Sequence, residues 1–311
     1  MRILIVCSGN KLNFNVEKHQ AFIYDQVEAV KQLDTTLQFD YFFVKGKGLI
    51  GYLSCLSALK KQLDSQVYHC IHAHIAVSGL LANLQRKVPV VTTFHGSDIV
   101  QPVLRGVSSL VDWLSRRTIY ITQPLVDKAF FTDRRKQAVV PCGVDFELFR
   151  PRPKQLSRRQ MGLSPYKRYV LFASNFHTPV KNYPLAKQAV NLLQDDTVEL
   201  LELKNYTRQE VAVLMTAVDA ALMTSFWEGS PQFVKEALAC NCPVVSTDVG
   251  DVRTVIQNIQ GCYITTYDPV DVADKLRRVL SSPWPISARE HISQFDSRLI
   301  AQQIQAVYQQ I

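Results

Sequence analysis

Residues 220–250 read AALMTSFWEGSPQFVKEALACNCPVVSTDVG, and this stretch decides the fold. The apolar run at 220–223 predicts a buried strand, the amphipathic stretch at 233–239 predicts a helix, and residues 243–246 predict a second strand. Ser230 as N-cap and Pro231 at the first helical position are favourable helix-start chemistry. A strand, a helix and a strand in succession are typical of a parallel sheet with a crossover helix.

The same alternation extends along the whole chain. Strands are predicted at residues 3–7, 39–44, 68–72, 88–94, 118–121 and 138–140, and again at 169–173, 198–203, 220–223, 243–246 and 262–264. Helices are predicted between them at residues 17–33, 53–63, 77–86, 183–193, 208–217, 233–239 and 270–280. Apolar strands separated by helices indicate parallel sheets covered on both faces. We therefore predict an α/β fold with two Rossmann-like, doubly wound domains that face each other across a cleft.

A break in the alternation marks the predicted domain boundary. Proline and glycine punctuate the chain at Pro141, Gly143, Pro151 and Pro153, and a polar basic stretch follows. We place an N-terminal domain at 1–150 and a C-terminal domain at 151–311. The last predicted helix, residues 298–311, either completes the second domain or packs back on the first.

The composition indicates a globular protein of a reducing compartment. The chain has 311 residues, 47% of them hydrophobic, and no run approaches the ~20 apolar residues of a membrane-spanning helix. Its first residues predict a buried strand and not a signal peptide. The seven cysteines are odd in number and scattered, which does not suit a disulfide framework. We expect a cytoplasmic protein.

The net charge of +8 is concentrated in the first half of the chain. Residues 1–150 hold 18 Lys and Arg against 12 Asp and Glu, whereas residues 151–311 hold 17 against 15. Such an excess favours an anionic partner, namely a membrane surface, a lipid pyrophosphate or nucleic acid, although an ordinary solvated surface explains it equally well. We expect no nucleic acid partner, because the basic residues are dispersed and no nucleic-acid-binding motif accompanies them.

Two carboxylates stand out in the stretch at 220–250. Glu228 lies in the predicted loop, and Glu236 lies almost two turns into the helix on a face shared with Gln232 and Phe233. The helix start offers backbone N–H groups and a positive dipole end to a phosphate. Carboxylates so placed can accept hydrogen bonds from hydroxyls at two points of one elongated ligand. A helix-start charge and an exposed glutamate are the alternative interpretation.

Two further candidates follow predicted strands. His95 follows the strand at 88–94, and the carboxyl ends of parallel strands are where such sheets bind ligands. A lone histidine is often structural there, and nearby Asp98 is either an acceptor-side residue or a helix N-cap. Lys181, in the loop after the strand at 169–173, can neutralise a diphosphate, or it is an exposed helix-start charge.

Weaker signals come from three other places. The loop at Gly9 and Asn10 can bring backbone N–H groups to a phosphate, but it lacks the three glycines of the dinucleotide fingerprint. Tyr206 is a candidate neighbour of a nucleotide base. His72 and His74 lie on one side of an extended segment, but no cysteine or carboxylate completes a metal-ligand set.

Taken in order, these motifs resemble glycosyltransferase family four, the group 1 glycosyltransferases, which have the two-domain GT-B fold. The family has a Glu, seven residues and a second Glu, matched by Glu228 and Glu236, and a His-Gly matched by His95 and Gly96. It also has a lysine after the first strand of the second domain, matched by Lys181. The family's preceding arginine is replaced here by Ser174 or Asn175.

The resemblance assigns roles to the two domains and to these residues. It implies that the N-terminal domain at 1–150 lies on the acceptor side and that the C-terminal domain at 151–311 binds the nucleotide sugar. It implies that Glu228 contacts the donor sugar, that Glu236 binds the ribose hydroxyls, and that His95 contacts the sugar or the leaving phosphate. Lys181 and Asn175 would face the diphosphate. The remaining donor-binding candidates are Gly9, Asn10, Tyr206, Gly229, Ser230, Pro231, Gln232 and Phe233.

The implied activity is retaining transfer of a sugar from a nucleoside diphosphate sugar, with a UDP-sugar favoured, to a glycan or lipid-linked acceptor in cell-surface polysaccharide synthesis. We expect no cofactor and no metal, because no Asp-x-Asp is present to hold a divalent ion. Peripheral attachment to the inner face of an anionic membrane would suit the basic first domain. The alternatives are a nucleotide-sugar epimerase of the same fold and a non-catalytic nucleotide-sugar-binding subunit.

Overall fold

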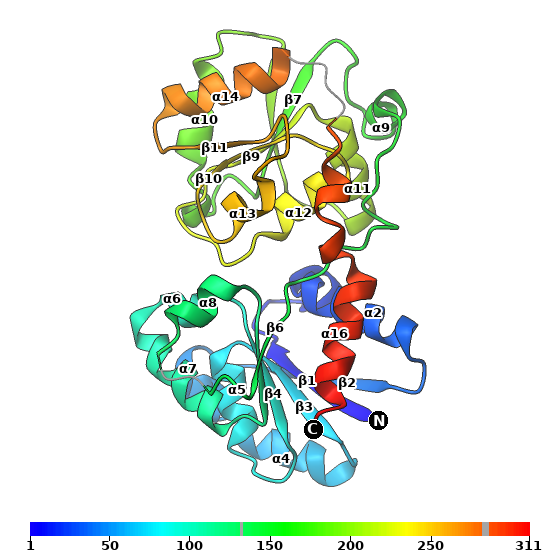
Figure 1. Cartoon of the computed structure of the whole chain (residues 1–311), viewed down its shortest axis with the longest axis vertical. Coiled ribbons are helices and arrows are strands. Elements are labelled where there is room, and N and C mark those ends of the chain that lie inside the picture. Colours follow the sequence, from blue (N-terminus) through cyan, green and yellow to red (C-terminus); the bar gives the residue numbers. More distant parts are fainter. Residues whose placement is uncertain (131–132, 282–285) are drawn as a thin grey trace. The chain divides into compact units, whose positions relative to one another are not determined.

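A computed structural model describes residues 1–130, 133–281 and 286–311 of the chain (Figure 1). These residues form two compact α/β units. The first unit comprises Met1–Gly143 and Ser297–Ile311, and the second comprises Val144–Asp296. Each unit has its own parallel sheet and its own hydrophobic clusters.

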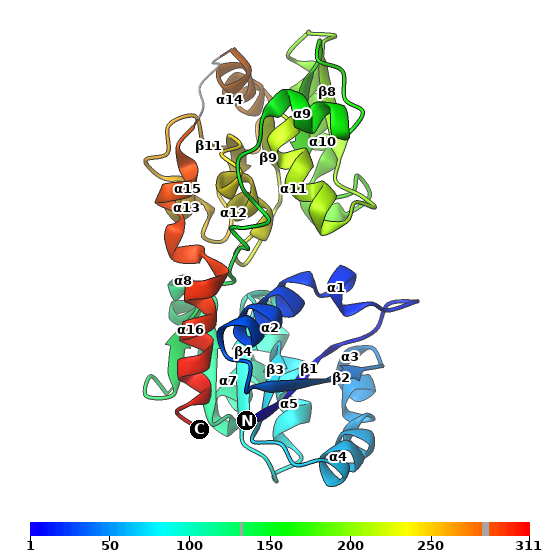
Figure 2. The same cartoon turned by 90° about the vertical axis from the view of Figure 1, so that its right-hand side faces the viewer.

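The division between the units falls earlier than the predicted boundary at residue 150. Val144, Phe146 and Phe149 are buried in a hydrophobic cluster of the second unit, which explains why the chain leaves the first unit at Gly143. The last helix, α16 (Ser297–Tyr308), lies alongside α2 (Ala21–Leu33) in the first unit, as Figures 1 and 2 show. The sequence left two positions open for this helix, and in the structure it packs back on the first unit.

In the described residues, the first unit is built on a six-stranded parallel sheet of order β2-β1-β3-β4-β5-β6. Its strands are β1 (Arg2–Ser8), β2 (Gln38–Val44), β3 (Cys70–His74), β4 (Val90–Phe94), β5 (Arg117–Tyr120) and β6 (Gln137–Val139). Its other helices are α1 (Val16–His19), α3 (Gly48–Leu53), α4 (Leu56–Ser65), α5 (Ala76–Asn83), α6 (Ser97–Val100), α7 (Pro102–Leu114) and α8 (Gln123–Lys128).

The central strand β1 shows why both faces of this sheet are covered. Ile3 and Ile5 pack into a cluster with residues of α2 and α16, whereas Leu4 and Val6 pack into a cluster with residues of α3, α4 and α5. Because side chains alternate across a strand, a strand that is apolar at consecutive positions must be covered twice. The prediction of a doubly covered sheet is confirmed.

The second unit has, among its described residues, a five-stranded parallel sheet of order β11-β10-β9-β7-β8. Its strands are β7 (Arg168–Phe172), β8 (Val198–Glu202), β9 (Ala220–Met223), β10 (Val244–Thr247) and β11 (Tyr263–Thr265). Its helices are α9 (Lys154–Gln160), α10 (Tyr183–Asn191), α11 (Arg208–Ala217), α12 (Gln232–Ala239), α13 (Val252–Ile256), α14 (Pro269–Ser281) and α15 (Ala288–His291), with short 3₁₀ turns η1 (Pro179–Lys181) and η2 (Ser293–Phe295).

Several predicted elements of the first unit have other bounds in the structure, and two of these differences have a clear cause. The strand predicted at 68–72 is β3, shifted two residues along the chain, because Ile71 to His74 pair with β4. The helix predicted at 17–33 is divided into α1 and α2, because Gln20 has non-helical backbone angles (φ −136°, ψ 44°). The shift of β3 places both His72 and His74 inside the sheet.

Because each sheet is parallel, the carboxyl ends of its strands lie at one edge. Asn175, Tyr206 and Glu228 follow β7, β8 and β9, so they lie at the same edge of the second unit's sheet. Gly9 and His95 follow β1 and β4 and lie at the corresponding edge of the first unit's sheet. Among the described residues, no helix has the length and apolar character that are needed to cross a membrane.

Candidate active site

The loop between β9 and α12, residues 224–231, is held in place by three neighbouring segments. Phe226 N–H donates to the Val180 carbonyl at 2.9 Å, and Thr247 Oγ1 donates to the Ser225 carbonyl at 2.7 Å. The hydroxyl of Tyr267 reaches the carbonyls of Ser225 and Phe226 at 3.2 and 3.3 Å. The loop is therefore a fixed part of the carboxyl edge of the sheet.

Lys181 and Glu228, both predicted site residues, form an ion pair in this loop. Lys181 Nζ lies 2.6 Å from Glu228 Oε1, and the two side chains are 21% and 16% exposed. The backbone of η1 is held by Thr224 Oγ1, which donates to the carbonyls of Lys181 and Asn182 at 2.9 and 3.0 Å. The structure thus brings a cation and a carboxylate together where a sugar diphosphate was predicted to bind.

A glycine contact fixes the turn at Gly229. Gly250 has φ +60°, and a Cβ built on it would lie 2.5 Å from the Gly229 carbonyl oxygen. Only glycine satisfies both the left-handed backbone and the close approach of the two chains. Gly250 therefore allows the segment after β10 to pack directly on the loop.

Ser230 does not cap α12, and this part of the sequence prediction is wrong. The N-cap is Pro231, and no side chain caps the helix. Ser230 Oγ instead donates to Asp251 Oδ2 at 2.6 Å and accepts from Lys235 Nζ at 2.6 Å. Lys235 is fully buried, lies 3.7 Å from Asp251 Oδ2, and stands 4.3 Å over the ring of Phe295. The serine hydroxyl is used to join the loop to a buried charge pair.

Glu236 is held by an arginine that the sequence reasoning missed. Glu236 Oε1 lies 2.6 Å from Arg208 Nη1, and its side chain is 7% exposed. Arg208 begins α11, where Thr207 and Glu210 form a reciprocal capping box, and its guanidinium stands 4.8 Å over the ring of Phe149. The capping box was a readable signal for the helix start, but the sequence held no signal for the contact with Glu236.

The remaining predicted donor residues of this unit lie in neighbouring loops. Asn175 Oδ1 accepts from His177 N–H at 3.0 Å, which shapes the turn after β7. Ser174 Oγ donates to Thr178 Oγ1 at 3.3 Å. Because serine and asparagine are uncharged, neither Ser174 nor Asn175 supplies the positive charge of the family's arginine. Tyr206 is 39% exposed just before α11. Their roles toward a ligand stay predictions.

Three histidines form a stacked series in the first unit. The rings of His72 and His74 lie 4.4 Å apart and those of His74 and His95 lie 5.3 Å apart. His72 is bonded on both nitrogens, to Tyr308 Oη and Thr93 Oγ1, each at 2.7 Å. The alternation that placed His72 and His74 on one side of the strand is confirmed.

His95 is oriented by His74, because His74 Nδ1 and His95 Nε2 lie 3.0 Å apart. Within the described residues, His74 Nε2 is buried with no partner. We assign the shared proton to His74 Nδ1, because the alternative tautomer would bury an N–H at Nε2 without an acceptor. His95 then carries its own proton on Nδ1.

Burial keeps these imidazoles neutral near pH 7. Desolvation lowers the pKa of His95 to about 4. It lowers the pKa of His72 to about 3, with a smaller effect of His95. Desolvation, with His72 and His95, also holds the pKa of His74 well below its ordinary value. A neutral His95 cannot act as a cation, and its Nδ1 lies 4.0 Å from Cys142 Sγ.

Asp98, the weaker sequence candidate, has a structural position. Its carboxylate is buried and accepts backbone N–H groups of Ala76, Gly96 and His95 at 3.1, 2.9 and 3.2 Å. Burial raises the pKa of Asp98 to about 6, opposed by these hydrogen bonds. The carboxylate joins the loop of His95 to the start of α5. It is not the N-cap of α6, which is Gly96.

The predicted phosphate contacts at Gly9 and Asn10 are used otherwise in the structure. The Gly9 N–H donates to the Val44 carbonyl at 2.9 Å. The Asn10 side chain donates to the Gly46 carbonyl and accepts from the Gly46 N–H, both at 2.6 Å. The Gly9 N–H and the Asn10 side chain therefore join the loops that follow β1 and β2, and the role of this segment toward a phosphate stays a prediction.

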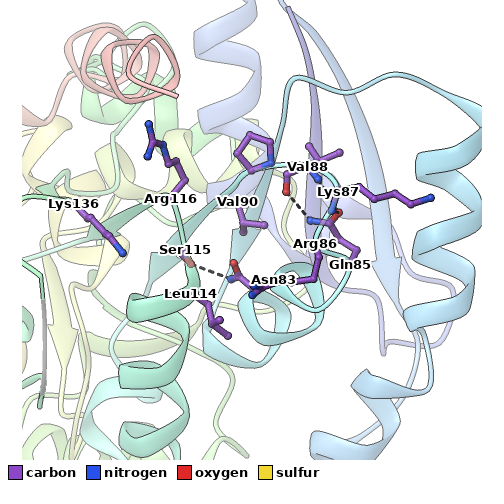
Figure 3. Close-up of a pocket in the computed structure, with 11 residues that line it drawn as sticks. Asn83, Gln85, Arg86, Lys87, Val88, Val90, Leu114, Ser115, Arg116 and Lys136 are labelled. Atoms are coloured by element: carbon purple, nitrogen blue, oxygen red, sulfur yellow. Dashed lines mark hydrogen bonds between the residues drawn. The ribbon is translucent and has the colours of Figure 1, made fainter.

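A cavity of about 390 Å³ lies away from these residues, at the amino edge of the first sheet (Figure 3). It is lined by Asn83, Gln85, Val90, Ser115 and four basic residues, among others, and Asn83 Nδ2 donates to Ser115 Oγ at 3.0 Å. Val90 begins β4, whereas His95 follows its end. The cavity is therefore at the opposite end of the strands from the predicted site.

Two parallel-sheet α/β units with polar site residues at their carboxyl edges define the GT-B class of glycosyltransferase, and solved structures agree. Sucrose-phosphate synthase from Thermosynechococcus elongatus superposes with a TM-score of 0.83 at 16% identity, covering 99% of this chain and 98% of that one. Anabaena HepE in complex with UDP and glucose superposes with a TM-score of 0.76 at 16% identity, covering each chain fully.

The chain belongs to glycosyltransferase family four and is a glycosyltransferase. Residues 24–148 match the family described as Glycosyltransferase Family 4, and residues 179–296 match Glycosyl transferases group 1. A D-inositol 3-phosphate glycosyltransferase of Geodermatophilus obscurus is 26% identical over 78% of this chain and 66% of that protein. An Escherichia coli UDP-Gal:α-D-GlcNAc-diphosphoundecaprenol α-1,3-galactosyltransferase is 23% identical over 72% and 69%.

Proposed function

We propose that the protein transfers a sugar, with retention of configuration, from a nucleoside diphosphate sugar to a glycan or lipid-linked acceptor in cell-surface polysaccharide synthesis. The observation that carries the proposal is the Lys181–Glu228 pair in the fixed loop at the carboxyl edge of the second sheet. A UDP-sugar is the favoured donor, because HepE binds UDP and the E. coli relative is named for UDP-Gal.

The donor residues would divide the ligand between them. Glu236, buried in the middle of α12, would accept hydrogen bonds from the ribose hydroxyls, with Arg208 fixing the carboxylate. The backbone around Gly229 would approach the phosphates, since a helix start favours an anion. Glu228 would accept hydrogen bonds from hydroxyls of the sugar once its lysine partner turns to the diphosphate. Ionic and hydrogen-bonding groups would then meet each part of the donor.

The chemical step needs stabilisation of the departing diphosphate. In the proposed step the bond between the anomeric carbon and the phosphate oxygen breaks, the acceptor oxygen bonds to the same face of that carbon, and the acceptor proton passes to the diphosphate. Lys181 and backbone N–H groups would stabilise the negative charge that develops, the usual source of a large catalytic effect. We propose that no metal is needed. His95 keeps the role that the family resemblance implies.

A donor panel tests this proposal. The protein is mixed with UDP, GDP, ADP and CMP sugars, and thermal stabilisation and nucleotide release are measured. One donor should stabilise the protein and release its nucleotide, and Lys181→Ala and Glu236→Ala should impair both. Lys167→Ala and Glu199→Ala are matched controls, because that pair joins exposed side chains at the amino edge of the same sheet.

The outcomes separate the proposal from its alternatives. Retention is checked by the anomeric configuration of the product in NMR spectra. Interconversion of a sugar nucleotide without acceptor would indicate an epimerase, and donor binding without nucleotide release would indicate a non-catalytic subunit. If no donor stabilises the protein, or if the control variants are as impaired as the site variants, the proposal is wrong.

A further inference from the structure

Two loops at the carboxyl edge of the first sheet are joined into one surface. They are the segment between β1 and α1 and the segment between β2 and α3, and the paired hydrogen bonds between Asn10 and Gly46 hold them together. In Figure 2 the dark-blue segment between β1 and α1 projects outward on the side where α3 lies. The loop surface is defined here by Lys11, Leu12, Lys45, Lys47, Leu49 and Ile50.

Large aliphatic side chains form the outermost part of the loop surface. Leu12 is 92% exposed, Ile50 is 85% exposed and Leu49 is 43% exposed. Below Leu12, the rings of Phe14 and Phe43 lie 4.8 Å apart and line a cavity of about 670 Å³. Single exposed aliphatic residues are ordinary, but three of them lie on or directly after the loops that Asn10 and Gly46 join, and Leu12 also lines the cavity, which favours an interaction site.

Exposed lysines lie on the same two loops as these aliphatic side chains. Lys11, Lys45 and Lys47 are exposed, and Lys18 is exposed nearby on α1. In the part of the chain that the structure describes, the ion pairs of this unit involve other residues. The two loops and α1 hold Glu17 as their acidic residue. The loop surface therefore combines exposed aliphatic side chains with an excess of positive charge.

We propose that the loop surface docks on a membrane that contains anionic phospholipids. Leu12 and Ile50 would enter the boundary between headgroups and acyl chains, and the lysines would lie among the lipid phosphates. Lysine is depleted in protein–protein interfaces, whereas at a membrane its chain can lie along apolar surface with its charge in the headgroup layer. The combination of residues thus favours a membrane over a second protein.

This inference extends the proposed function, because it places a membrane beside the carboxyl edge at which His95 lies. Only its relevance to a lipid-linked acceptor rests on that function. Vesicle binding needs no donor, so its failure and the failure of the proposed transfer are separate results.

The opposite edge of the same sheet offers a competing surface. Trp113 is 71% exposed there, beside Arg116 and Lys136. Two of the cations at that edge already have partners, since Lys136 Nζ donates to the Trp113 carbonyl at 3.0 Å and Lys87 pairs with Asp64. We therefore favour the loop surface, and the experiment includes both.

The test is sedimentation of the full chain with vesicles of phosphatidylcholine alone and of phosphatidylcholine mixed with phosphatidylglycerol. We expect binding to the mixed vesicles that weakens as salt is added. Lys11→Gln/Lys47→Gln should weaken it about 30-fold, from about 1 kcal/mol for each lysine. Leu12→Asn/Ile50→Asn should weaken it at least about tenfold. Lys60→Gln/Lys61→Gln, an equal charge change at exposed positions of α4, should have little effect.

A second measurement gives a positive signal. Tryptophan fluorescence of Leu12→Trp should shift to the blue on adding the mixed vesicles, because the indole enters an apolar layer. The proposal is overturned if the protein does not bind the mixed vesicles, or if the α4 control loses as much binding as Lys11→Gln/Lys47→Gln. It is also overturned if the loop variants still bind, whereas Trp113→Ala and Arg116→Gln/Lys136→Gln abolish binding.

Discussion

Asp251→Asn should destabilise the second unit far more than an ordinary surface substitution. Lys235 is fully buried, and its carboxylate partner Asp251 is 3.7 Å away and 11% exposed. At that distance and an effective dielectric constant of about 20, the attraction is about 4.5 kcal/mol. Removal of one partner of a buried pair leaves an uncompensated charge, which costs about 3–5 kcal/mol. Asparagine keeps the size and the acceptor for Ser230, so the charge is the main change.

The effect should depend on the charge of Lys235. In Lys235→Met/Asp251→Asn neither charge is buried, so the double variant should be more stable than Asp251→Asn alone. Asp248→Asn is the matched control, because Asp248 pairs with Arg253 in an exposed position and such pairs contribute little. The order of stability should be Asp248→Asn, then the double variant, then Asp251→Asn.

Denaturant unfolding measures the stability of the whole chain, and hydrogen exchange of the α12 amides reports on the second unit alone. The loop at Gly229 should exchange faster in Asp251→Asn, because Ser230 links this loop to the charge pair. Donor binding should weaken in parallel. The buried-pair reasoning is refuted if Asp251→Asn and Asp248→Asn lower the unfolding free energy equally. It is also refuted if the loss in the double variant equals the sum of the losses in Lys235→Met and Asp251→Asn.

Three further outcomes are expected. Gly250→Ala should lower the unfolding free energy by more than about 1 kcal/mol and weaken donor binding. Gly162 has φ +67° and open space around it, so Gly162→Ala should lower the unfolding free energy only by the cost of the left-handed backbone. Equal losses in the two variants would contradict the close-approach argument. The unfolding free energy should fall as the pH drops from about 6.5 toward 3, because the unfolded chain binds a proton at His72 that the buried native imidazole does not bind. His72 contributes up to about 1.4 kcal/mol per pH unit to this fall. Urea midpoints at pH 7 and 5 check it, and His72→Gln should flatten the pH dependence. EDTA should leave nucleotide release unchanged, and loss of activity that Mg²⁺ restores would refute metal independence.

The sequence predicted the two sheets because the signal for them is local. Consecutive apolar residues in β1 and β7 require cover on both faces, and the helices between strands supply it. The prediction missed α7, in which Gly106 interrupts the helical signal although Val107 and Val111 keep the spacing of an apolar face. A glycine in a helix lowers the propensity, but packing on the sheet overrides it.

The candidate site could be predicted in part. The spacing of Glu228 and Glu236 and the position of His95 at a strand end are properties of the chain itself. The structure has Glu228 and His95 at the carboxyl edges of their sheets and Glu236 within α12. The prediction that Ser230 caps the helix was wrong, because its hydroxyl is bonded to Asp251 and Lys235 instead. Nothing in the sequence indicated either contact. The preference of serine for an N-cap position contributes less free energy than the pairing of a buried charge.

The sequence by itself therefore determined the strands, the two-unit α/β fold and the type of residue at each carboxyl edge, since periodicity and composition act over a few residues. Only the tertiary structure decided the partners: Lys181 with Glu228, Arg208 with Glu236, His74 with His95, and Gly250 against the carbonyl of Gly229. These contacts join segments far apart in the chain. Their energies depend on burial and on distances of a few ångströms, and neither exists until the sheets have formed.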